Sequence, residues 1–109
     1  MRRSETKRAV MSDLNYEFEG ELWRVTGDSW HFVTVPKDYS EHIKAFVQSK
    51  TPGFGSIRVK VTLGEEVWKT SLFPDSKSGC YFLPIKADIR KKAKIGHGDM
   101  LAIQLDIDI

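Results

Sequence analysis

The chain presents one pattern twice, and this repetition restricts its possible folds more than any other feature. Residues 21–63 contain Trp23, a strand-like segment, "HFVTVP", a helix-like segment and "GFGSIRVKVTL". Residues 66–107 contain Trp68, a strand-like segment, "YFLP", a helix-like segment and "GHGDMLAIQLDI". Neither half can bury its apolar face alone, so we expect the two to pack as one pseudo-twofold unit. That unit would be a duplicated strand–strand–helix–strand motif.

The repeat predicts specific equivalences between the halves. Residues 16–63 should superpose on residues 66–108 by a near-twofold rotation. In this alignment Trp23 matches Trp68 and Gly53 matches Gly96. Halves of unlike topology would contradict the duplication.

Hydrophobic periodicity predicts a mainly β class, a small closed or nearly closed barrel of about six strands with two short helices. The predicted strands are residues 15–26, 30–35, 57–63, 67–72, 80–83 and 101–107, and the predicted helices are residues 37–46 and 86–95. A shift in the alternation suggests a bulge near Gly20 or a strand end with two buried sides, and Gly96 suits the C-cap of the second helix.

The alternation also predicts the core. We expect its centre to be formed by Ile57, Val59, Val61, Leu101, Ile103 and Leu105. Val59→Asp should then unfold the domain, because it would bury an unpaired carboxylate. We also expect Trp23, Trp30 and Trp68 to pack in the core rather than form a platform.

Length and charge indicate one domain over residues 14–109, preceded by a disordered basic arm over residues 1–13. The chain has a net charge of +2. The first ten residues hold four basic residues and one acidic residue, so the rest of the chain is near neutral. Nucleic-acid-binding domains usually have a strongly basic body.

Cysteine and histidine usage predicts no disulfide, no metal and no cofactor. Cys80 is the one cysteine, and His31, His42 and His97 share no metal-ligand spacing. The N-terminus lacks the apolar run of a signal peptide, and no stretch has transmembrane length. We therefore expect a cytoplasmic protein without a membrane partner.

Several segments resemble the bacterial family called domain of unknown function 1905. The matching segments are "YEFEGELW", "WHFVTVP", "GSIRVKVTLG", "VWKTSLFP", "YFLPIKADIR" and "GHGDMLAIQLDID". The resemblance spans about residues 16–108 and implies a double-split β-barrel, the architecture of AbrB-like regulators and antitoxins. It implies no activity, because that family has none assigned.

Our first functional hypothesis is a non-enzymatic binding or accessory module for an anionic small molecule or protein partner. The candidate surface lies in the second half and consists of Lys69, Ser71, Tyr81, Lys86 and Arg90. Aromatic, basic and hydroxyl groups together suit an anionic or sugar-like ligand. We expect Arg90 to be exposed beside Lys86 and Lys94; the alternative is a guanidinium bonded to strand carbonyls or to Asp99.

Two other functions remain open. The fold analogy with AbrB-like regulators and the basic arm suggest a nucleic-acid-binding regulator. A shared fold does not imply a shared function, and the near-neutral charge of the rest of the chain does not favour this role. A small hydrolase would use Cys80 as nucleophile and His31 as base, provided the two lie close together. We expect a monomer, with a dimer as the alternative.

Overall fold

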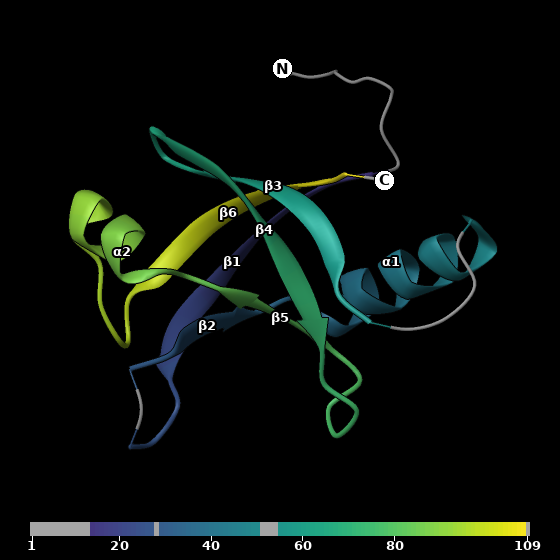
Figure 1. Cartoon of the computed structure of the whole chain (residues 1–109), viewed down its shortest axis with the longest axis horizontal. Coiled ribbons are helices and arrows are strands. Elements are labelled where there is room, and N and C mark those ends of the chain that lie inside the picture. Colours follow the sequence, from purple (N-terminus) through teal and green to yellow (C-terminus); the bar gives the residue numbers. More distant parts are fainter. Residues whose placement is uncertain (1–13, 28, 51–54, 109) are drawn as a thin grey trace.

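Alternating apolar and polar residues build six strands, which close into an antiparallel barrel in a computed structural model of the chain (Figure 1). The structure describes residues 14–27, 29–50 and 55–108. The strands are β1 (Asn15–Arg24), β2 (His31–Thr34), β3 (Ile57–Leu63), β4 (Glu66–Pro74), β5 (Tyr81–Pro84) and β6 (Met100–Ile107). The predicted arm over residues 1–13 and the predicted role of Gly53 lie outside the described residues.

The strands follow the order β1-β2-β5-β4-β3-β6 around the barrel, and every neighbouring pair is antiparallel. Strand β1 pairs with two neighbouring strands along different parts of its length. It pairs with β6 from Asn15 to Glu21 and with β2 from Leu22 to Arg24. The mainly β class and the six-stranded barrel with two helices are therefore confirmed.

The barrel interior is the hydrophobic core, and the predicted strand phase is correct. All six residues predicted for its centre are buried: Ile57, Val59, Val61, Leu101, Ile103 and Leu105. Leu22, Val33, Leu72 and Leu83 join them from the other four strands, each fully buried. Since side chains alternate between the two faces of a strand, the neighbours of these residues lie on the outer surface.

Two helices lie on opposite sides of the barrel, α1 (Lys37–Lys50) and α2 (Ala87–Ala93) (Figure 1). Each contributes one buried isoleucine to the core, Ile43 from α1 and Ile89 from α2. In the described part of the chain, no helix combines the length and apolarity needed to cross a membrane.

The prediction that Gly96 ends α2 is wrong. The C-cap is Lys94, which has a left-handed backbone at φ 57° and ψ 49°. Its N–H donates to the carbonyl oxygens of Arg90 and Lys91. These short-range hydrogen bonds close the last turn two residues before the glycine.

The order of elements and the strand pairing are the same in both halves. Exchanging β1 with β4, β2 with β5 and β3 with β6 leaves the pairing scheme unchanged. The predicted match of Trp23 with Trp68 is nevertheless wrong. Trp23 lies opposite Phe32 in the β1–β2 pair, and Phe73 lies opposite Phe82 in the β4–β5 pair. Phe73 thus occupies the place of Trp23, whereas the overall superposition of the halves stays a prediction.

Gly20 permits a close approach between strands, and the bulge predicted there is absent from the described register. The β1–β6 pairing runs without a break through the Gly20–Leu101 pair. A Cβ at position 20 would lie 2.6 Å from Cγ1 of Val33. Glycine is therefore required where β1 leaves β6 and turns to β2.

Candidate functional site

The five residues predicted to form one binding surface lie in three different places. Lys69 and Ser71 face outward from β4, on the side opposite to the buried Thr70 and Leu72. Tyr81 lies in the core, with 7% of its surface exposed. The remaining two, Lys86 and Arg90, lie near the start of α2.

Tyr81 does not join the outer surface, which corrects the prediction. The error was one of strand phase, because Tyr81 alternates with the outward Phe82 and lies on the same face as Leu83. Burial raises the pKa of the Tyr81 phenol above its ordinary value. A neutral, buried phenol contributes packing to the barrel and is not presented to a ligand.

Lys69 and Ser71 have partners within the domain. Arg58 Nη1 donates to Ser71 Oγ over 3.3 Å. The ammonium of Lys69 lies 3.8 Å from a carboxylate oxygen of Asp108. This part of β4 is an ordinary polar outer face that pairs with β3.

Lys86 and Arg90 instead line a groove between the start of β2 and the start of α2. The groove has a volume of about 230 Å³ and is lined by Ser29, Trp30, His31, Pro84, Ile85, Lys86, Ala87 and Arg90. We call it the Trp30 groove. The Trp30 side chain is 56% exposed, so the groove combines an accessible indole with three basic side chains.

Arg90 is half-buried in the wall of this groove, so its predicted exposure is wrong. Its Nη1 donates to the carbonyl oxygen of Ile85 over 2.8 Å. The alternative of a guanidinium bonded to a carbonyl is therefore correct, with Ile85 as the acceptor. A guanidinium has five N–H donors. The bond to Ile85 uses one and holds the plane of the others in a fixed direction.

His31 is also oriented by a local hydrogen bond. Its Nδ1 lies 2.7 Å from the carbonyl oxygen of Ser29. A carbonyl can only accept, so Nδ1 carries a proton. The Nε2 atom is then the ring nitrogen that remains for another partner.

The corresponding place in the first half has similar backbone hydrogen bonds but different side chains. Val35 N donates to Tyr81 O there, as Ile85 N donates to His31 O beside the groove. Ser40 Oγ donates to Val35 O, as Arg90 Nη1 donates to Ile85 O. Ser40 is buried, however. At this place in the first half, Lys37 Nζ donates to the carbonyl oxygen of Ser78. The same backbone arrangement therefore carries different side chains in the two halves.

A row of aromatic rings continues from the groove across the outer face of the barrel. Trp30 stacks on Phe32 with ring centroids 5.8 Å apart and an angle of 9° between the planes. Phe32 lies 5.2 Å from Trp23 and 5.8 Å from Phe82. Phe73, opposite Phe82 in register, is 44% exposed. We call these five residues the aromatic row.

Sequence reasoning missed this row because it assigned the tryptophans to the core. Trp30 is exposed, Trp23 is half-buried on the outer face, and Trp68 is half-buried and packs against the core. The alternation contained the signal, since Phe32 precedes the inward Val33 and Phe82 precedes the inward Leu83. Two aromatic residues in the outward phase of adjacent strands indicate a surface cluster.

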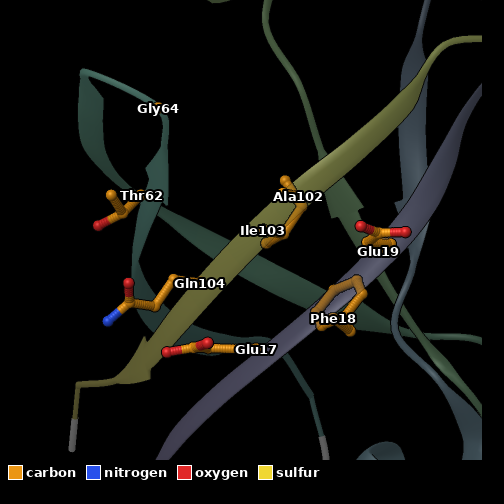
Figure 2. Close-up of a pocket in the computed structure, with 8 residues that line it drawn as sticks. All are labelled: Glu17, Phe18, Glu19, Thr62, Gly64, Ala102, Ile103 and Gln104. Carbon is orange, nitrogen blue, oxygen red and sulfur yellow. The ribbon is translucent and has the colours of Figure 1, made fainter. Parts of the chain in front are cut away.

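A second depression lies over β1, β6 and the β3–β4 turn (Figure 2). Glu17 and Glu19 project over it from β1, and Gln104 and Thr62 stand beside it. Among the described residues that line it, none is basic. Two carboxylates without a cation repel an anion, so this depression does not fit the predicted ligand.

Cys80 and His31 do not form the dyad that a hydrolase would need. In the β2–β5 pair, Thr34 lies opposite Phe82, and the Ile85 N–H bonds to the His31 carbonyl. Cys80 therefore lies at the far end of the pair from His31. The described residues also contain no cluster of three or more His, Cys, Asp or Glu that could hold a metal ion.

The geometry defines a class of protein, a small six-stranded barrel domain whose distinctive surface is a groove with an exposed indole and basic walls. Comparison with known families then places the chain: the model for the domain of unknown function DUF1905 matches residues 18–105, and the chain belongs to that family. A search of curated proteins found no match. No activity is assigned to this family, so a function is inferred from the site itself.

Proposed function

We propose that this domain is a non-enzymatic binding module whose ligand combines a planar ring with a negative charge and occupies the Trp30 groove. The single observation that carries the proposal is the lining of the groove, which brings the exposed ring of Trp30 together with Lys86 and Arg90. Of the five residues singled out from the sequence, the proposal retains Lys86 and Arg90 as candidate ligand-binding residues.

Each wall of the groove has a distinct part in binding. The indole of Trp30 offers a flat apolar surface on which a planar ring can stack. Lys86 supplies a flexible point charge, whereas the guanidinium of Arg90 is held by its bond to Ile85 and can donate to two oxygens of one anion. Because Arg90 is already positioned, less conformational entropy is lost on binding.

The two halves carry different side chains at this place, which supports a specialised role for the Trp30 groove. In the first half, Lys37 Nζ donates to the carbonyl oxygen of Ser78, and the buried Ser40 stands where the second half has Arg90. The backbone hydrogen bonds correspond in the two halves, so the difference lies in the side chains.

The proposal is tested by calorimetric titration with deoxyadenosine monophosphate, deoxyadenosine and inorganic phosphate. We expect the monophosphate to bind more tightly than either part alone. Lys86→Glu should weaken its binding by about tenfold or more, because hydrogen bonds to charged groups contribute roughly 1.5–3 kcal/mol. Lys92→Glu is the matched control: Lys92 is an exposed cation on the same helix and does not line the groove, so its effect should be about twofold or less because of solvent screening. Equal effects of the two variants would refute the groove as the site.

A further inference from the structure

We infer that the natural ligand of this surface is a single-stranded nucleic acid, whose phosphates lie at the Trp30 groove and whose bases stack along the aromatic row. The inference rests on the proposed function, because it extends the same groove to a longer ligand. The juxtaposition that carries it is the direct stacking of Trp30, a groove residue, on Phe32, a row residue.

The aromatic row crosses four adjacent strands on one outer face. Each of its members on a strand neighbours a fully buried leucine or valine, which fixes its outward direction. The inward neighbours are Leu22 for Trp23, Val33 for Phe32, Leu83 for Phe82 and Leu72 for Phe73. Strands lie about 4.8 Å apart, so the row extends over roughly 14 Å. This length is several times the size of one ring and exceeds what a mononucleotide can cover.

Two of the rings remain open to solvent. Trp30, which directly precedes β2, is 56% exposed, and Phe73, on β4, is 44% exposed. Between them Phe32 and Phe82 are half-buried and contact each other. Four-stranded sheets that bind single-stranded RNA stack about two or three bases on outward aromatic rings of this kind. A strand of nucleotides that reaches both exposed rings would pass over Phe32 and Phe82.

Basic side chains stand at the groove end of the row, although the net charge of the domain is near neutral. They are His31, Lys86 and Arg90. The carboxylates of Glu17 and Glu19 lie on the part of β1 that pairs with β6, above the second depression (Figure 2). Glu21 is a third exposed carboxylate of β1 and lies two residues before Trp23 in the same outward phase.

The aromatic row favours a single-stranded nucleic acid over a duplex. In a duplex the bases are stacked on each other and only their edges are accessible, so the aromatic row would have no ring to contact. In a single strand the base faces are available, and each stacked base contributes by alanine substitution about 1–3 kcal/mol, or roughly five- to 150-fold in affinity.

The experiment titrates the domain into a labelled single-stranded deoxyadenylate of about ten nucleotides and into the matching duplex, and follows both by fluorescence anisotropy. Binding of the mononucleotide is measured by calorimetry. We expect the single strand to bind at least about tenfold more tightly than the mononucleotide or the duplex. Phe73→Ala should remove most of this gain while leaving mononucleotide binding unchanged. The matched control is Val67→Ala, since Val67 is an exposed apolar residue on the same strand whose partner Thr62 lies on β3, away from the row.

The outcomes separate this inference from the proposed function. Mononucleotide binding at the groove with no gain for the single strand would overturn the inference and leave the proposed function standing. Equal affinity for the duplex would overturn it by showing that phosphate contacts alone suffice. Tighter binding of polyglutamate than of the oligonucleotide would overturn it in favour of an acidic protein segment. Failure of every probe to bind would refute both.

Discussion

Ser40 shows how a single buried hydroxyl holds the two halves together. It is 1% exposed, donates to the carbonyl oxygen of Val35 and accepts from the backbone N–H of Tyr81 on β5. Both contacts lie where α1 leaves the barrel. A buried polar group with satisfied hydrogen bonds costs little, whereas the loss of one partner leaves the other unpaired in the core.

We expect Ser40→Ala to lower the free energy of unfolding by about 1–3 kcal/mol, because the Tyr81 N–H would lose its acceptor in a buried place. Urea denaturation followed by circular dichroism measures this change. Ser71→Ala is the control, since Ser71 lies on the outer face and accepts only a long 3.3 Å bond from Arg58; its effect should remain within about 0.5 kcal/mol. An equal cost for the two variants would contradict the role of Ser40.

The sequence predicted the core residues correctly but only part of the candidate site. The inward phase of Val59 or Ile103 follows from alternation, and the structure confirms it. The groove depends on Arg90 turning back to Ile85 and on Trp30 leaving the core, and both result from tertiary contacts between β2 and α2. No periodicity within one segment records such a contact.

At the scale of elements, strand β1 and helix α2 each depend on one backbone position. In β1 this position is Gly20, where an added Cβ would meet Val33 at 2.6 Å. In α2 it is Lys94, whose left-handed backbone ends the helix. Sequence reasoning located both elements, but the bulge that it offered at Gly20 and the C-cap that it placed at Gly96 are wrong. Glycine is a frequent residue at helix ends, and this favoured Gly96 over Lys94.

Gly20→Ala should destabilise the barrel by about 1–3 kcal/mol, since Val33 is fully buried, branched at Cβ and unable to move aside. Thermal unfolding measures the change. Gly96→Ala is the control, because a Cβ there meets nothing within 4 Å and its φ is not among the positive values. A neutral or slightly stabilising effect is expected at Gly96, and a neutral effect at Gly20 would contradict the close approach.

Lys94→Gly should stabilise the domain by about 0.5–1 kcal/mol, because glycine adopts the left-handed conformation at φ 57° without a steric penalty. Lys92→Gly, inside α2, should instead destabilise it by about 1 kcal/mol. Chemical denaturation of the two variants distinguishes these opposite signs. A loss of stability in Lys94→Gly would show that Lys94 does not form the cap in solution.

At the scale of the whole molecule, barrel closure brings the ends of the described domain together. Asn15 lies opposite Asp106, and the Ile107 N–H donates to the carbonyl oxygen of Leu14. The turn at Gly64 and Glu65 separates the two strand–strand–helix–strand halves. Because the two ends lie together, they could be joined and the chain opened at another turn. The same six strand pairs would still close the barrel.

A circular permutant should fold if a short Gly-Ser linker joins residue 108 to residue 14 and the new ends lie between Gly64 and Glu65. All six strand pairs are kept, and the opened turn is exposed. Circular dichroism and a cooperative thermal transition provide the measurement. A permutant opened between Ile103 and Gln104, inside β6, should not fold, and the failure of the first permutant as well would contradict the proximity of the ends.

The overall fold was predictable because the alternation of apolar and polar residues extends along the strands of the whole chain, whereas the site depends on closure of the barrel. Lys86 and Arg90 are close in sequence, but Trp30 and His31 reach them only through the β2–β5 pair. The pairing also separates Lys69, Ser71 and Tyr81 from these residues. Their grouping was predicted from nearness in the sequence, which does not show how the strands pair.

Mapping of amide chemical shifts during titration with deoxyadenosine monophosphate tests the proposed binding site most directly. We predict that the largest changes occur at residues 29–31, 85–87 and 90 and at the indole N–H of Trp30, with saturation at one ligand per chain. Largest changes instead at Glu17, Glu19 and Gln104, or at Lys69 and Ser71 on β4, would contradict the Trp30 groove as the binding site of this domain.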